Sequence, residues 1–65
     1  MDTKGDAMFK IQYRAEGGHS WDTLDEYTSS EAWTMYREYI LAFGTHKGAT
    51  VRMVRRGEVV AETTF

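Results

Sequence analysis

Polar and apolar residues alternate one by one over residues 8–15 (MFKIQYRA). This alternation predicts a β-strand with one buried face, because successive side chains in a strand point to opposite sides. Every second residue from Phe9 to Ala15 would face the core. Gly17 and Gly18 follow, and such a pair is typical of a two-residue hairpin turn. Residues 19–27 (HSWDTLDEY) are therefore expected to form the partner strand.

The turn at Gly17-Gly18 would fix the register of this hairpin. Leu24 then becomes the core residue of the second strand, whereas Trp21 and Tyr27 lie on the outer face of the sheet. A slip of one residue would exchange the two faces of this strand, so a register with Trp21 inside stays open as an alternative. The predicted cross-strand pairs are Glu16 with His19, Arg14 with Trp21, Tyr13 with Asp22, Gln12 with Thr23, Ile11 with Leu24, Lys10 with Asp25, Phe9 with Glu26 and Met8 with Tyr27.

The segment from Thr28 to Gly44 (TSSEAWTMYREYILAFG) is the only stretch with the periodicity of a helix of useful length. Its apolar residues fall on one broad face when the chain turns by about 100° per residue. Thr28 and Glu31 form a capping-box pattern at the start, and Gly44 can close the helix in the left-handed conformation. The predicted core-facing residues are Ala32, Trp33, Tyr36, Tyr39, Ile40 and Phe43.

Residues 49–54 (ATVRMV) and 58–64 (EVVAETT) alternate again and predict a second hairpin. The three residues between them, Arg55-Arg56-Gly57, predict a type I turn followed by a bulge, with Gly57 in the left-handed conformation. The predicted pairs are Met53 with Val59 and Val51 with Ala61 on the core side, and Val54 with Glu58, Arg52 with Val60 and Thr50 with Glu62 on the outer side.

The element order strand, strand, helix, strand, strand predicts an α+β fold with ββαββ topology. A right-handed crossover of the helix over the first strand gives a four-stranded antiparallel sheet of order 2-1-3-4, with the helix packed on one face. Residues 8–65 would form this single domain, and the polar residues 1–7 a disordered lead-in. The predicted core consists of Phe9, Ile11, Tyr13, Leu24, Ala32, Tyr36, Ile40, Phe43, Val51, Met53, Val59 and Ala61.

Length and composition limit how such a domain can be stabilised. The chain has 65 residues and no cysteine, so aromatic and aliphatic packing must hold it together. Its net charge of −2 argues against a function dominated by phosphate binding, which needs a concentrated positive field. The chain contains no apolar run near the roughly 20 residues that span a bilayer and no signal-peptide pattern. We therefore expect a soluble, cytoplasmic protein.

No combination of residues in the sequence predicts a catalytic, cofactor-binding or metal site. His19 and His46 fall in predicted loops, and a metal ion would need further ligands converging on one of them. Carboxylates are plentiful, but a catalytic acid–base pair needs two of them in a shaped pocket. A domain with one helix and one sheet has little room for such a pocket, so the protein is expected to be non-enzymatic.

The outer face of the predicted sheet is the most informative surface. Aromatic residues, methionine and arginine inside a polar rim are the composition of protein-binding surfaces. Exposed apolar clusters on soluble domains usually mark contact sites. We therefore expect this face to bind another protein. The predicted partner-binding residues are Arg14, Trp21, Tyr27, Arg52, Val54 and Val60.

Two alternatives use the same surfaces. In a small nucleic-acid-binding domain, Trp21 and Tyr27 would stack on bases while Arg55 and Arg56 bind phosphates; the acidic residues interspersed on the sheet weigh against it. In a homodimer, two copies would pair their free edge strands or stack their open sheet faces. No membrane contact is expected.

Three stretches, FKIQYRA, WDTLDEYTSSEAW and GATVRMVRRGEVVA, follow one another as a strand, the entry to the helix and the final two strands. In size, element order and lack of catalytic residues, the chain resembles small phage-encoded inhibitors of host machinery. These include the short RNA-polymerase inhibitor of some lytic phages and several anti-CRISPR proteins. The resemblance covers most of the chain and implies a protein that blocks a surface of a host protein. It assigns no role to an individual residue.

Overall fold

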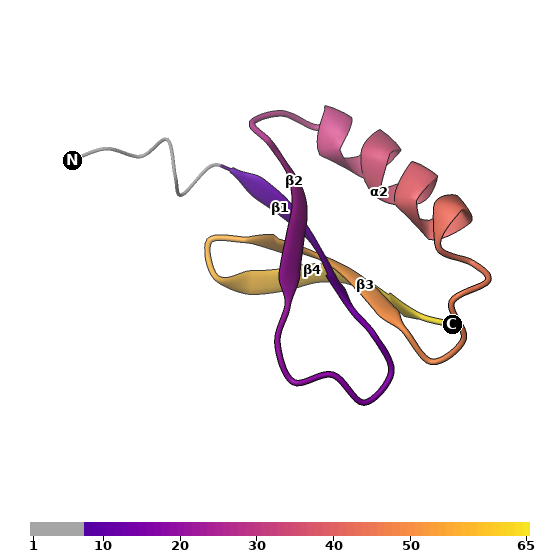
Figure 1. Ribbon diagram of the computed structural model, residues 1–65. Helices are drawn as coiled ribbons and strands as arrows, with labels where there is room; N and C mark the ends of the chain where they lie inside the picture. The colour runs from indigo at the N-terminus through magenta and orange to yellow at the C-terminus, as the bar shows by residue number, and fades with distance from the viewer. Residues whose placement is uncertain (1–7) are drawn as a thin grey trace.

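The computed structural model describes residues 8–65, which form a sheet with a helix along one face (Figure 1). The elements are β1 (Phe9–Arg14), β2 (Asp22–Tyr27), α2 (Glu31–Ala42), β3 (Thr50–Arg55) and β4 (Glu58–Thr64). Neighbouring strands are antiparallel and their order is β2-β1-β3-β4. The predicted α+β fold and its ββαββ topology are therefore confirmed. The lead-in predicted for residues 1–7 lies outside the described residues.

The core lies between α2 and the two central strands of the sheet. Ile11, Val51 and Met53 are fully buried, because every second residue of β1 and β3 faces the helix. Ala32 and Tyr36 are the buried residues of α2. Around this centre pack the predicted residues Tyr13, Leu24, Ile40, Phe43 and Ala61, together with Tyr27, Met35, Tyr39 and Phe65.

The first hairpin follows the predicted register only up to the middle of β2. Gln12 lies opposite Thr23, as predicted. The next residue, Leu24, is extra, so Asp25 rather than Leu24 pairs with Ile11. Leu24 still packs against the core. This arrangement is a β-bulge, in which two residues of one strand oppose a single residue of its partner.

The bulge changes the face of the sheet to which the side chains at the end of β2 point. Tyr27 was predicted on the outer face, but it pairs with Phe9 and packs against the core on the helix side. That placement was wrong, because one inserted residue shifts every later side chain to the opposite face. Trp21 precedes the bulge and keeps its predicted place on the face away from α2, beside Arg14.

The bulge also turns Asp25 toward α2, where its carboxylate lies close to two tyrosines. Tyr27 Oη donates a hydrogen bond to Asp25 Oδ2 at 2.6 Å, and Tyr39 Oη lies 3.5 Å from the same oxygen. The hydrogen bond from Tyr27 is the main cause that lowers the pKa of Asp25 below its ordinary value of 3.8. The same bond raises the pKa of Tyr27 to about 12. The ionised carboxylate therefore links β2 to α2.

Asp25→Asn is expected to flatten the acid dependence of stability. Because folding lowers the pKa of Asp25, its contribution is present above the unfolded value of 3.8 and is lost as the pH falls through the lower, folded-state value. Thermal unfolding followed by circular dichroism from about pH 6 to about pH 2.5 covers this transition. The exposed Asp22 on the same strand supplies the control, Asp22→Asn. Equal acid slopes for wild type and Asp25→Asn would contradict the assignment.

Both hairpin turns differ in detail from the predictions. The first is centred on Glu16 and Gly17: the amide of Gly18 donates to the carbonyl of Ala15 at 2.9 Å, and Gly17 has a φ of 77°. The second is a two-residue turn, because Arg55 pairs directly with Glu58.

The turn between β3 and β4 has positive φ at both central residues. The φ angles are 56° at Arg56 and 77° at Gly57, and positive φ at both positions is what a type I′ turn requires. The predicted three-residue turn, with a left-handed residue only at Gly57, was therefore wrong. A type I′ turn matches the natural twist of the two strands, which accounts for a non-glycine residue at positive φ.

The shorter turn changes the register of β4. Ala61 still faces the core, opposite Met53, but Val60 becomes an extra residue and Val59 lies opposite Val54. Val59 is 48% exposed, so its predicted place in the core was wrong. The bulge at Val60 compensates for the missing turn residue and restores the core side from Ala61 onward.

Neither end of α2 uses the predicted cap. The helix begins after Ser30, whose side chain makes no capping hydrogen bond. Instead, Ser29 Oγ accepts a hydrogen bond from the amide of Glu31 at 3.3 Å. At the other end, Gly44 does not have a positive φ, and the amide of Phe43 continues the helical pattern by donating to Tyr39.

Candidate functional site

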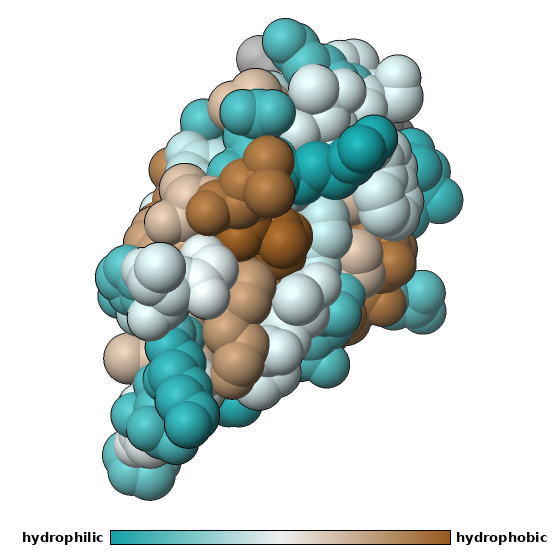
Figure 2. Space-filling model, turned by 90° about the vertical axis from the view of Figure 1, so that its right-hand side faces the viewer, coloured by the Kyte–Doolittle hydropathy of each residue, from teal (hydrophilic) through white to brown (hydrophobic). Residues whose placement is uncertain are grey.

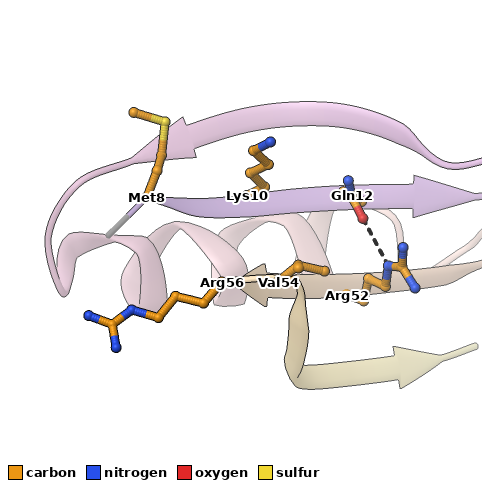
Figure 3. A pocket seen from close by; sticks show the side chains of 7 residues that line it. Met8, Lys10, Gln12, Arg52, Val54 and Arg56 are labelled. Carbon is orange, nitrogen blue, oxygen red and sulfur yellow. Dashed lines mark hydrogen bonds between the residues drawn. The ribbon is translucent and has the colours of Figure 1, made fainter. Parts of the chain in front are cut away.

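The face of the sheet opposite α2 is not covered by any other helix or strand of residues 8–65 (Figure 1). In β1 and β3, the residues that alternate with the core residues lie on this face. Figure 3 shows several of them side by side, with the helix behind the strands. We call this surface the open face; its residues in the central strands are Lys10, Gln12, Arg14, Thr50, Arg52 and Val54.

Trp21 lies on the open face in contact with two arginines from two other segments. Arg14 Cζ is 4.5 Å and Arg52 Cζ is 3.8 Å from the centroid of the Trp21 ring. Both distances are those of cation–π interactions. We call these three residues the Trp21 cluster. It joins the segment just before β2 to both central strands, so the half-buried indole is held in place by its neighbours.

Gln12 fixes the position of the second of these arginines. Its Oε1 accepts a hydrogen bond from Arg52 Nε at 2.9 Å (Figure 3). The Nε2 group of the same amide donates to Thr23 Oγ1 at 3.3 Å. Arg52 is therefore constrained twice, by a hydrogen bond to β1 and by its contact with Trp21.

A hollow of about 450 Å³ lies on the open face next to the Trp21 cluster. In Figure 3, Arg52 is at one end of the hollow, Met8 and Arg56 are at the other, and Lys10 and Val54 lie between them. Its described lining contains three cationic residues and no acidic one. Within residues 8–65, the lining is Met8, Lys10, Gln12, Arg52, Val54, Arg56 and Gly57.

Charge on the open face is arranged by strand. Lys10 and Arg52 lie on the central strands, whereas Glu26 on β2 lies opposite Lys10 and Glu62 on β4 lies opposite Arg52. The cationic strip along the middle of the sheet is therefore flanked by acidic residues on the outer strands. The net charge of −2 for the whole chain conceals this local separation.

The structure brings together most, but not all, of the residues predicted to bind a partner. Arg14, Trp21 and Arg52 form one cluster, and Val54 lines the adjacent hollow. Val60 is 40% exposed at the bulge in β4. Tyr27 is separated from them on the helix side. Whether any of these residues contacts a partner stays a prediction.

Sequence reasoning missed the two features that organise the site. The amide of Gln12 had no assigned role, because nothing in its sequence neighbourhood indicates a hydrogen bond to β3. Arg56 was predicted in a turn and, in the nucleic-acid alternative, as a phosphate contact together with Arg55, but its place in the hollow beside Val54 was not predicted, because it depends on the type of that turn. Alternation alone places Gln12 on the open face, but it does not reveal the contact with Arg52.

Arg55 and Arg56 diverge, although they are adjacent in the sequence. Arg55 Cζ lies 4.8 Å above the ring of Phe9, on the side of the sheet that faces the core. Its Nε is buried and has no hydrogen-bond partner among the described residues. Only Arg56 lines the hollow, so the two arginines do not form the joint phosphate-binding patch considered from the sequence.

Comparison with known proteins leaves the site to be interpreted from its own geometry. No protein-family model, curated protein or solved structure matches this chain. Within residues 8–65, no helix combines the length and apolar content needed to cross a membrane. The resemblance to small phage-encoded inhibitors therefore stays a hypothesis.

A second hollow, smaller in volume and with mainly apolar lining, lies on α2. Apolar side chains gather in the middle of the side of the molecule seen in Figure 2. On the helix, Ile40 and Leu41 line a shallow hollow of about 200 Å³ together with Arg37. Leu41 is 77% and Trp33 is 43% exposed, so the indole of Trp33 can report on the helical side of the molecule.

The loop histidine His46 packs against aromatic residues. Its ring centroid is 5.0 Å from that of Phe43 in an edge-on arrangement, and its Nδ1 lies 3.3 Å from Tyr13 Oη. Among residues 8–65, no group of three or more histidine, cysteine, aspartate or glutamate side chains is placed to hold a metal ion. The histidine therefore has a packing role at the end of α2.

Proposed function

We propose that this protein is a non-enzymatic binding module that docks on another protein through its open face. The observation that carries the proposal is the Trp21 cluster beside a hollow with apolar and cationic lining, on a face that α2 leaves uncovered. Tryptophan and arginine are the residues most enriched among those that dominate protein–protein affinity. Here, Arg52 and Trp21 also fix each other in position.

A constrained contact residue favours affinity because it loses little conformational entropy on binding. Arg52 is held by Gln12 and Trp21, so part of this entropy has already been lost on folding. The adjacent hollow is lined by two apolar side chains, Met8 and Val54, and a partner would remove them from water. Together they provide a central anchor and an apolar contact area, which is the usual anatomy of a protein interface.

We further propose that binding inhibits the partner by covering its surface, as the resemblance to small phage-encoded inhibitors implies. A domain of 65 residues can block a surface without chemistry of its own. Such inhibition requires only that the open face and the functional surface of the partner overlap. The resulting complex would be stoichiometric, so inhibition should saturate at one copy of the protein for each partner.

Paired tryptophan variants test the proposed surface. The chain has two tryptophans, Trp21 on the open face and Trp33 on α2. Immobilised wild type and Trp33→Ala are expected to capture the same protein from a cell lysate, identified by mass spectrometry. Trp21→Ala is expected to lose it, because the anchor and the position of Arg52 are both disturbed. Capture by folded Trp21→Ala at the wild-type level would contradict the proposed function.

A nucleic-acid-binding domain is the second candidate, and the cationic strip on the central strands favours it. Single-stranded nucleic acids bind to basic grooves that also expose aromatic rings for stacking. The indole of Trp21 is already in contact with Arg14 and Arg52, and Arg55 is on the other side of the sheet. Binding to a short single-stranded oligonucleotide that weakens steeply with salt would favour this candidate over protein binding.

The structure disfavours a homodimer formed by pairing of edge strands. Both outer strands contain a bulge, at Leu24 in β2 and at Val60 in β4. Bulges on edge strands interrupt the row of hydrogen-bonding groups that a second copy would need. In the other dimer considered from the sequence, two open faces would stack. This arrangement would bring Lys10, Arg52 and Arg56 of one copy close to the like charges of the second copy.

A further inference from the structure

We propose that the hollow on the open face binds a carboxylate next to apolar side chains, in an acidic segment of the partner protein. This inference rests on the proposed function and names the chemistry of the segment that the open face recognises. The carboxylate would bind at Arg52, and the neighbouring apolar side chains would lie over Val54 and Met8.

The charge of the lining selects for an anion. Lys10, Arg52 and Arg56 surround the hollow, and no acidic residue is among its described lining. A carboxylate that enters it would replace part of its hydration with charge-assisted hydrogen bonds, which are about twice as strong as neutral ones. A cationic segment would be repelled by these three charges, and a neutral segment would accept no hydrogen bond between opposite charges from them.

The position of Arg52 favours a carboxylate in particular. Guanidinium groups bind carboxylates through two parallel hydrogen bonds when the plane of the guanidinium is fixed. The Nε of Arg52 is bonded to Gln12, and the group also stacks on Trp21. Within residues 8–65, this bond to Gln12 is the only hydrogen bond of the guanidinium. Its two terminal amines make no hydrogen bond within these residues and so can donate to a ligand at this end of the hollow.

The apolar part of the lining indicates which residues should flank the carboxylate in the partner's segment. Met8 and Val54 are the apolar members of the lining, and they lie between or beyond the cations rather than at a separate site (Figure 3). The volume of about 450 Å³ is within the range of about 300–1,000 Å³ that is usual for binding pockets. An acidic residue flanked by apolar residues fits this pattern, whereas a run of acidic residues alone would leave the apolar part exposed.

The flanking acids distinguish an acidic protein segment from a phosphate backbone. Glu26 and Glu62 lie on the outer strands, opposite Lys10 and Arg52. A polymer with a charge at every unit would approach these carboxylates wherever it left the central strip, and like charges at close range repel. A protein segment can place one carboxylate over Arg52 and neutral residues over the outer strands.

A short capped peptide with glutamate between two leucines is the probe for this inference. The matched control peptide has glutamine in place of glutamate, and inorganic phosphate is the third ligand. Binding is followed by the NMR signals of the Trp21 indole N–H and the Arg52 Nε–H. The glutamate peptide is expected to shift both signals at about millimolar concentration, and the glutamine peptide at least about tenfold more weakly.

Two variants test the other cations without disturbing the Trp21 cluster. Lys10→Gln and Arg56→Asn are each expected to weaken binding of the glutamate peptide about two- to fivefold. Asparagine is chosen at position 56 because it tolerates the positive φ of this turn. Lys47 lies in an exposed loop and does not line the hollow, so Lys47→Gln removes the same charge and is expected to leave binding unchanged.

Three results would overturn the inference: equal binding of the glutamate and glutamine peptides, phosphate binding as tight as that of the glutamate peptide, or no shift at millimolar peptide. The proposed function is judged separately by capture of the protein partner. If Trp21→Ala loses the partner while Lys10→Gln with Arg56→Asn retains it fully, protein binding stands and the acidic segment does not. If Trp21→Ala retains the partner, the proposed function itself fails.

Discussion

Ile11→Ala is expected to leave most molecules unfolded at room temperature. Ile11 is completely buried and lies at the centre of the sheet, opposite Met53 on β3 and Asp25 on β2. Truncation of a buried isoleucine to alanine costs about 2–5 kcal/mol, because the cavity that remains is only partly refilled. A single core in a domain of this size supplies no more than about 3–5 kcal/mol of stability. The loss is therefore comparable to the whole free energy of unfolding.

Urea unfolding followed by far-ultraviolet circular dichroism measures this effect. Ile11→Val should lower the free energy of unfolding by about 1 kcal/mol and keep the protein folded. Its urea unfolding curve can therefore be compared directly with that of the wild type. Val59→Ala is the matched control, because Val59 is also aliphatic and also in the sheet but is 48% exposed. It is expected to change stability by less than about 1 kcal/mol. If Val59→Ala is as damaging as Ile11→Ala, then the register of β4 described above is wrong.

Arg52→Glu is expected to reduce affinity for the protein partner by about a hundredfold or more, the effect of losing a dominant interface residue. The substitution removes the contact with Trp21 and the hydrogen bond to Gln12. It also places a carboxylate opposite Glu62 and reverses the charge at one end of the hollow. Three favourable features of the open face are thus lost together, which makes this the largest functional effect expected from one substitution.

Titration calorimetry with the purified partner gives the affinity of each variant. Arg52→Lys should fall between wild type and Arg52→Glu, because lysine keeps the charge but has neither the planar group nor the Nε that bonds Gln12. Arg37→Glu makes the same charge reversal on the exposed side of α2 and should bind like wild type. A folded Arg52→Glu variant with unchanged affinity would remove Arg52 from the binding surface.

The order of the elements could be predicted because hydrophobic periodicity is a local property. Alternation in residues 8–15 and 49–54 identifies the two central strands, and one amphipathic stretch identifies the helix. These strands are regular throughout, so the choice of inward and outward residues was correct for Ile11, Val51 and Met53. Once the order of elements is known, few sheet topologies satisfy the handedness of the crossover.

The outer strands could not be predicted to the same level because each contains one irregularity. A bulge at Leu24 sends Tyr27 to the helix side, where it gains the hydrogen bond to Asp25. This gain depends on contacts between β2 and α2, which no local pattern contains. At the second hairpin, Arg56 adopts a positive φ that is unusual for arginine, so the sequence Arg-Arg-Gly favoured the wrong turn.

The composition of the candidate site was predictable, whereas its geometry was not. Alternation places Arg14 and Arg52 on the outer face of the sheet. Trp21 comes before the bulge, so the predicted register also places it correctly on this face. The contact between Trp21 and Arg52 spans residues that are far apart in the chain. The role of Gln12 and the hollow next to it arise only when β1 and β3 are paired.

The two tryptophans allow the central claim to be tested in one experiment. Trp21 is on the open face and Trp33 is on α2, so their indole N–H signals in an NMR spectrum report on opposite sides of the molecule; Trp33→Phe assigns them. On addition of the captured protein partner, the Trp21 signal is expected to shift or broaden while the Trp33 signal keeps the chemical shift of the free protein. A selective change at Trp33, with Trp21 unaffected, would show that the helical side binds the partner and would contradict the account.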